Sequence, residues 1–126
     1  MTDSSKNNRK AAIRHTAEVL WENPPGHSPG AISKMLVRPE NADTKLLDFR
    51  ISCYQPMDHV EPHAHKVQEQ VYHVLEGEGM MELDGERNVV RSGNVIFIPP
   101  GVNHAIYNTG VVDLVFLVIT TPPDDA

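Results

Sequence analysis

From Ala31 onward the chain is a succession of short apolar-rich segments separated by turn residues, and this spacing limits the fold more than any other feature. The segments are 31–37, 45–54, 71–75, 79–84, 87–90, 94–99, 104–108 and 112–120, with a further extended stretch at 63–65. Short strands repeated at intervals of roughly 8 to 12 residues are typical of β-sandwiches and barrels. Asp84-Gly85 has the sequence of a two-residue hairpin turn. The sequence therefore predicts an all-β domain.

The 126 residues suit one domain with one core. We expect an N-terminal arm over residues 1–30 and a barrel over residues 31–126. The first ten residues are polar, and residues 11–22 fit neither a helical apolar stripe nor a strict alternation. The prolines and glycines of residues 23–30 predict a loop.

Composition narrows the range of partners. The chain has 11 Lys plus Arg against 17 Asp plus Glu, a formal charge of -6, and no basic cluster, so we expect no nucleic acid and no membrane surface as partner. The longest apolar run, residues 114–119, is too short to span a bilayer as a helix. The single cysteine, Cys53, and a polar start without a signal-peptide core favour a reducing, cytoplasmic setting.

Three histidines are candidates for a metal site. His63 and His65 are two residues apart, so on an extended chain their imidazoles share one face. A pair of histidines at this spacing says little by itself. A separate segment carries His104 directly after a turn built on Pro99 and Gly101, and a third imidazole from another strand makes metal coordination the stronger interpretation.

This pattern resembles the cupin superfamily, whose motifs are written G(X)5HXH(X)3,4E(X)6G and G(X)5PXG(X)2H(X)3N. The second motif is matched at every fixed position, by Gly93, Pro99, Gly101, His104 and Asn108. In the first motif His63, His65 and Gly77 fit, whereas Met57 stands where the opening glycine belongs. The resemblance covers residues 45–121 and implies a double-stranded β-helix, the cupin jelly-roll barrel, with a metal in its mouth.

The acidic ligand of the first motif is displaced, which leaves two candidates for the fourth ligand. Glu69 follows His65 after three residues, but seven residues then precede Gly77, where the family has six. Gln70 satisfies both spacings and lies on the strand face that the register turns inward. A carboxylate is the stronger ligand for a divalent cation, so Glu69 stays an alternative, while strand register favours Gln70.

With Gln70, the ligand set of His63, His65, Gln70 and His104 is uncharged, and a bound divalent ion keeps its full charge. We expect such a site to attract a small anionic metabolite and to act as a Lewis acid in isomerase- or lyase-type chemistry. A dioxygenase with non-haem iron and a non-catalytic small-molecule-binding cupin are the alternatives, so enzymatic activity itself stays open. Iron, manganese, nickel and zinc all accept these donors, and the sequence does not choose among them.

Two residues on predicted strands are candidates for catalysis. Tyr72 would supply a phenol beside the metal, although an aromatic residue on a strand more often fills a core. Arg50 belongs to a polar strand face with Asp48 and Ser52. That face either meets solvent or lines the cavity, where the guanidinium would clamp a substrate carboxylate.

His59 is the third catalytic candidate. It has the strand parity of His63 and would line the mouth as an acid or base. Pro56 and Pro62 make the path between these residues irregular, which favours hydrogen bonding in a surface loop instead.

The last strand, residues 112–120, is apolar at nearly every position, which predicts burial on both faces. A single small barrel leaves its outer surface in water, so we expect a second copy to cover this strand, and the cupin resemblance also implies a homodimer.

Gln70 also resembles the glutamine of small cupins that linearise unsaturated uronates. Those proteins are thought to use an acid and an arginine near this end of the chain, where Ile119, Thr120 and Thr121 stand here.

Overall fold

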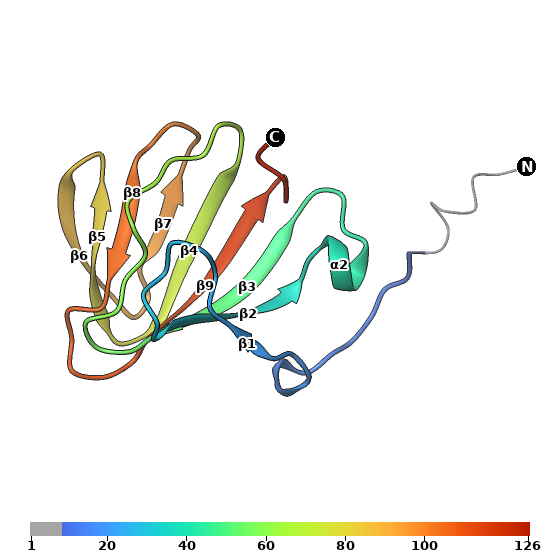
Figure 1. Ribbon diagram of the computed structural model, residues 1–126, viewed down its shortest axis with the longest axis horizontal. Helices are drawn as coiled ribbons and strands as arrows, with labels where there is room; N and C mark the ends of the chain where they lie inside the picture. Colours follow the sequence, from blue (N-terminus) through green and yellow to red (C-terminus); the bar gives the residue numbers. More distant parts are fainter. Residues whose placement is uncertain (1–8) are drawn as a thin grey trace, which may run out of the picture.

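The computed structural model describes residues 9–126, and the first eight residues of the predicted arm lie outside that range. The described chain forms nine strands and two short helices (Figure 1). The strands are β1 (Trp21–Glu22), β2 (Ala31–Val37), β3 (Asp48–Tyr54), β4 (Glu69–Glu76), β5 (Glu78–Leu83), β6 (Glu86–Arg91), β7 (Val95–Ile98), β8 (His104–Tyr107) and β9 (Leu114–Thr121). The helices are the 3-10 helix η1 (Thr16–Glu18) and α2 (Pro39–Ala42). None of the helices in residues 9–126 has the length and apolar character needed to cross a membrane.

Two antiparallel sheets pack against each other. The larger sheet has the order β1-β2-β3-β9-β4-β7 and the smaller sheet the order β6-β5-β8, and Figure 1 shows the smaller sheet at one end of the larger one. Val74 and Phe116 of the larger sheet share one buried cluster with Met81, Val90 and Ile106 of the smaller sheet. This arrangement confirms the predicted all-β jelly-roll barrel.

The predicted strands are confirmed with small shifts at their ends, except at one place. The stretch from His63 to His65 is not a strand, because only His63 pairs, in an isolated antiparallel bridge with His104. Pro62, which precedes it, has no N–H to extend the pairing. The sequence also gave no signal for β1 or α2. Both are too short for a periodic pattern, and α2 instead starts with Pro39 at its first turn and Asn41 accepting from the Arg38 N–H.

The polar face of β3 points into the barrel. Asp48, Ser52 and Tyr54 are buried, whereas Phe49 and Ile51 on the opposite face are only partly buried. The interior at this end is a polar cavity, so side chains that hydrogen-bond belong on the inner face. The polar face of β3 therefore lines the cavity and does not face solvent.

The outer face of β9 is not buried within one chain. Its buried residues alternate with partly or fully exposed ones, and Ile119 is 40% exposed. We expected a second copy of the chain to cover this face, and a single chain does not test that expectation, so it stays a prediction.

Residues 23–30 fold against the barrel. Asn23 Nδ2 donates to the carbonyl oxygens of Ser28 and Ala31 at 2.9 and 3.0 Å. Ser28 Oγ donates to Asp58 Oδ1 at 2.7 Å, and the Glu61 N–H donates to the Gly26 carbonyl at 2.9 Å. The loop predicted from its prolines and glycines thereby becomes part of the wall around the cavity.

Candidate metal centre

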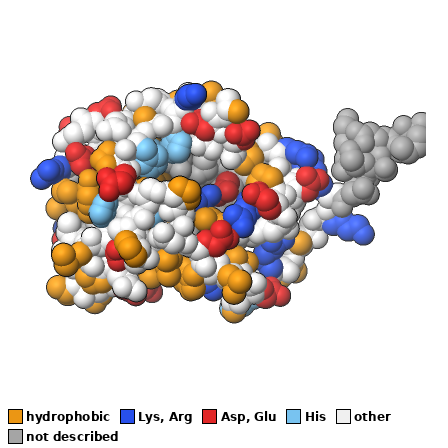
Figure 2. Space-filling model, in the orientation of Figure 1, with side chains coloured by type: hydrophobic (Ala, Val, Ile, Leu, Met, Phe, Trp, Pro, Cys, Tyr) orange, Lys and Arg blue, Asp and Glu red, His pale blue; other side chains and the backbone are white. Residues whose placement is uncertain are grey.

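Three imidazoles converge at the mouth of the barrel. Each of His63, His65 and His104 offers one nitrogen, and these atoms lie within 4.8 Å of one another. The backbones of His63 and His104 are paired in both directions, with N–H to carbonyl distances of 3.0 and 2.8 Å. On the face shown in Figure 2, histidine side chains are grouped at the surface with acidic side chains nearby. The predicted meeting of the three histidines is found, although a backbone bridge rather than a strand produces it.

Hydrogen bonds at the second ring nitrogen orient two of these imidazoles. Nδ1 of His63 lies 2.7 Å from the Glu61 carbonyl oxygen, and Nδ1 of His104 lies 3.0 Å from the Val102 carbonyl oxygen. A ring nitrogen facing a carbonyl carries the proton, which leaves Nε2 with a free lone pair. In this tautomer Nε2 is the nitrogen of each ring that can bind a metal.

Three buried polar atoms on the candidate metal ligands have no hydrogen-bond partner. Nε2 of His65, Nε2 of His104 and Oε1 of Gln70 are buried and make no hydrogen bond with any described residue. Such atoms each cost about 1–3 kcal/mol when left unsatisfied. Two imidazole nitrogens and an amide oxygen are donors that a divalent transition metal accepts, so the residues fit a metal ion.

Burial favours the neutral form of two candidate ligands, His104 and His65. It lowers the pKa of His104 to about 4. Burial, followed by the neighbouring His63, lowers the pKa of His65, against a smaller opposing effect of Asp125 and Gln70. Imidazoles bind metal only when unprotonated, so both rings are ready for a metal at neutral pH.

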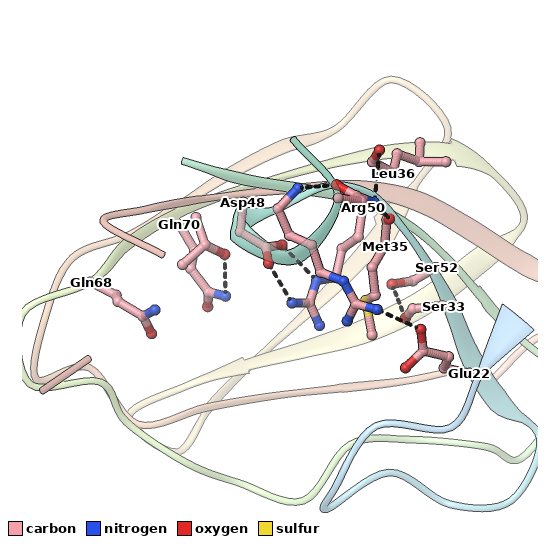
Figure 3. Close-up of polar contacts among 12 residues, drawn as sticks. Glu22, Ser33, Met35, Leu36, Asp48, Arg50, Ser52, Gln68 and Gln70 are labelled. Carbon is pink, nitrogen blue, oxygen red and sulfur yellow. Dashed lines mark hydrogen bonds and ion pairs between the residues drawn. The ribbon is translucent and has the colours of Figure 1, made fainter. Parts of the chain in front are cut away.

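Gln70 lines the same cavity as His63 and His65. Its side chain is buried, and Nε2 donates to Thr120 Oγ1 at 3.0 Å (Figure 3). The bond fixes which end of the amide is the donor, so Oε1 is the end left for another partner. Glu69 is exposed on the other face of β4. The structure brings Gln70 and not Glu69 to the cavity.

A cavity of about 290 Å³ extends from the histidines into the barrel. Its lining side chains include His27, Ser33, Asp48, Arg50, Ser52, Tyr54, His63, His65, Gln68, Gln70, Tyr72 and Thr120. The volume is near the lower end for ligand pockets, so it suits a small molecule rather than a polymer segment.

Asp48 and Arg50 form an ion pair in the cavity wall. Arg50 Nε donates to Asp48 Oδ1 at 2.9 Å and Nη2 donates to Oδ2 at 3.0 Å (Figure 3). The Asp48 side chain is 9% exposed and that of Arg50 27%. The pair occupies one edge of the guanidinium and leaves the Nη1 side for a ligand. Thr120 of β9 is the cross-strand neighbour of both Asp48 and Gln70. The ion pair on β3 and the amide on β4 are therefore separated by one strand, β9.

Tyr72 lines the cavity between the core and the histidines. Its ring stacks on Phe116, with centroids 5.3 Å apart, and meets His104 edge-on at 6.3 Å. Burial raises the pKa of Tyr72, so the hydroxyl stays protonated and can donate a hydrogen bond.

His59 contacts Tyr107 and Glu61, and its role as an acid or base stays a prediction. Its ring stacks on Tyr107 at 5.4 Å, its Nε2 lies 3.0 Å from Glu61 Oε1, and it is not among the residues that line the cavity.

Sequence reasoning missed His27, which does line the cavity. Its Nδ1 lies 2.9 Å from the Pro25 carbonyl, and burial lowers its pKa. The sequence carried no periodic signal for a histidine in a loop. The long-range pairing of His27 with Val60, together with backbone hydrogen bonds of Gly26 and Ser28 on either side, brings it to the cavity.

Known proteins share this fold and part of the sequence. A family model described as the cupin domain matches residues 50–120. The chain is 36% identical over 64 residues to an oxalate-binding protein of Thermotoga maritima, covering 51% of this chain and 53% of the relative. It spans about half the length of the curated relatives it matches first.

Two solved structures have the same fold over most of the chain. A predicted oxalate decarboxylase from Thermotoga maritima superposes with a TM-score of 0.78 at 27% identity, covering 87% of this chain and 98% of that one. The polyketide cyclase RemF from Streptomyces resistomycificus gives a TM-score of 0.78 at 25% identity, covering 90% of this chain and 83% of that one.

Proposed function

This chain belongs to the cupin domain family, and on that premise we propose that it is a metal-dependent enzyme acting on a small carboxylate by lyase- or isomerase-type chemistry. The observation that carries the proposal is the set of buried unpartnered donor atoms on His65, Gln70 and His104, of which His65 and Gln70 line a small polar cavity. With His63 they form an uncharged ligand set for one divalent ion. That ion, when bound, supplies a Lewis acid for a carboxylate or enolate oxygen.

The cavity residues provide the rest of the proposed chemistry. Arg50 binds the distal carboxylate of the substrate through its Nη1 side, while Asp48 holds the guanidinium in place from the other edge. Tyr72, protonated because it is buried, donates a hydrogen bond to a substrate oxygen. The loop that carries His27 closes one side of the cavity and limits access of water to the site.

The similar proteins suggest which carboxylate to test first. One relative is named an oxalate-binding protein, and one solved structure is called a predicted oxalate decarboxylase. Oxalate is small enough for a cavity of about 290 Å³. We therefore take oxalate as the first probe and other small carboxylates as the next ones.

The test begins with the metal content of protein purified without an affinity metal. Calorimetry then compares oxalate binding to the metal-loaded protein and to the chelator-treated protein, and turnover is followed as loss of the carboxylate. We expect binding only with the metal present, and turnover without oxygen uptake. Rapid oxygen uptake with ferrous ion would favour a dioxygenase, and tight binding without turnover of any small carboxylate would favour a binding protein.

We also propose that two copies pair through the outer face of the larger sheet. Phe97 and Ile119 both lie opposite Val71 in the sheet, and Phe49 lies opposite Ile119, which makes an apolar row across four strands. Phe97 is 56% exposed in the single chain. Light scattering should give the mass of a dimer for the wild type and of a monomer for Phe97→Lys, whereas the exposed loop change Val111→Lys should leave the dimer intact. A monomeric wild type would overturn this pairing.

A further inference from the structure

The segment after β9 returns to the loop between His65 and Gln70. The carboxylate of Asp125 accepts hydrogen bonds from three consecutive backbone N–H groups, those of Lys66 at 3.0 and 2.9 Å, Val67 at 2.9 Å and Gln68 at 3.2 Å. The loop therefore folds around one carboxylate that comes from a distant part of the chain.

The same carboxylate faces a candidate metal ligand. Asp125 Oδ2 lies 3.7 Å from Nδ1 of His65, which is too long for a hydrogen bond but close enough for a strong interaction of charges. The Nδ1 atoms of His63 and His104 face backbone carbonyls instead. Among the three imidazoles, His65 is thus the one with a carboxylate behind it.

The negative charge of Asp125 has fixed partners. Hydrogen bonds from the backbone N–H groups of Lys66, Val67 and Gln68 stabilise the charged carboxylate. A carboxylate behind a metal-bound imidazole fixes the ring orientation and increases the basicity of the other nitrogen.

We propose that Asp125 is a positioning residue of the metal centre, which shapes the loop between His65 and Gln70, orients the His65 ring, and brings to the surroundings of the ion the negative charge that the uncharged ligand set lacks. Asp125 has this role in metal binding only if the proposed function is right that these residues hold an ion. Its contact with His65, however, exists in the metal-free protein and can be tested there.

Asp125→Asn and Asp124→Asn form a matched pair, because both remove one charge from adjacent residues. Asp124 is exposed, and its side chain accepts from the N–H of Ala126. Competition with a chromophoric chelator gives the Kd of the protein for Zn²⁺. We expect Asp125→Asn to weaken zinc binding by about 10- to 100-fold and Asp124→Asn to change it by no more than about twofold.

Imidazole ¹⁵N spectra of the metal-free protein separate positioning from folding. In the wild type the carboxylate should hold the proton of His65 on Nδ1, and Asp125→Asn should shift the ring toward the other tautomer. A purely structural role would lower the unfolding temperature and leave the tautomer unchanged. If Asp125→Asn does not fold, Asp125→Glu, which keeps the charge on a longer side chain, should fold and retain the wild-type tautomer with weaker zinc binding.

Two results would overturn the assignment. One is a zinc Kd for Asp125→Asn equal to that of Asp124→Asn, and the other is an unchanged His65 tautomer in a folded Asp125 variant. A wild type that binds no divalent metal would refute the proposed function instead, and the tautomer measurement would still decide whether Asp125 acts on His65.

Discussion

Replacing Gln70 by glutamate tests whether the neutral amide sets the charge of the site. Thr120 Oγ1 now accepts from the amide Nε2, and a hydroxyl can turn to donate to a carboxylate instead. The side chain should therefore keep its place while the ligand set gains one negative charge. We expect the protein to bind a divalent metal more tightly and a carboxylate more weakly.

The size of the second effect follows from the geometry. The three imidazole nitrogens lie within 4.8 Å of one another, and an anion on the same ion would lie at a comparable distance from the side chain at position 70. Two negative charges about 5 Å apart repel each other by about 3 kcal/mol at an effective dielectric constant of about 20. Oxalate binding should therefore weaken by about two powers of ten.

Calorimetry with oxalate on the metal-saturated wild type, Gln70→Glu and Glu69→Gln measures this difference. Glu69→Gln is the control, because Glu69 is exposed on the other face of the same strand. Its affinity for the metal and its affinity for oxalate should both stay at the wild-type value. Equal oxalate affinity in the wild type and in Gln70→Glu would refute the view that this side chain faces the ion. A loss of metal affinity in Glu69→Gln would show that the neighbouring carboxylate is the ligand after all.

Three further predictions concern the cavity and the histidines. Arg50→Lys keeps the charge but loses the planar fork, so the Kd for oxalate should rise about tenfold in calorimetry while the zinc Kd stays constant. Zinc at about 100 times its Kd should raise the free energy of unfolding by about 2.7 kcal/mol in urea titrations, and His104→Ala should abolish this gain. Burial lowers the pKa of His104 to about 4, below the ordinary value of about 6.5, so as pH falls the unfolded chain takes up the proton first. In the metal-free protein His104 should contribute a loss of up to about 3 kcal/mol in the free energy of unfolding between about pH 6.5 and about pH 4, and His104→Asn should remove that part of the loss in the same titrations.

The fold and most of the centre could be predicted from local patterns. Strand spacing indicated the barrel, and the fixed positions around His104 identified the family. The position of Gln70 followed from register, because β4 alternates regularly from Glu69 to Leu75, ahead of a register shift between Val74 and Glu76 and of the turn at Gly77, whose φ of 86° favours glycine. A shift by one residue would have exchanged the faces of Glu69 and Gln70.

Alternation could not show which face of β3 is the inner one. The pattern separates Asp48 and Arg50 from Phe49 and Ile51, but either set can face inward, depending on whether the interior is apolar or polar. Here the interior at this end is a polar cavity, and the ion pair lines it. The apolar set then lies on the outside of the sheet.

Contacts between distant segments had no local signal at all. Asp125 meets a loop 57 to 59 residues earlier in the chain, and His27 reaches the cavity through a bridge to Val60. Neither residue belongs to a periodic segment. Their roles depend on how the barrel closes, which the spacing of strands does not determine.

The two-way backbone pairing of His63 and His104 gives the centre one stiff half. A hydrogen-bonded antiparallel pair keeps its Cα atoms about 5.5 Å apart. The two imidazoles therefore start from backbone positions at a constant separation. His65 and Gln70, by contrast, flank a loop whose shape is held by side-chain contacts. We therefore expect that differences in the radius of the proposed ion are accommodated by small movements on the loop side, while the positions of His63 and His104 stay constant.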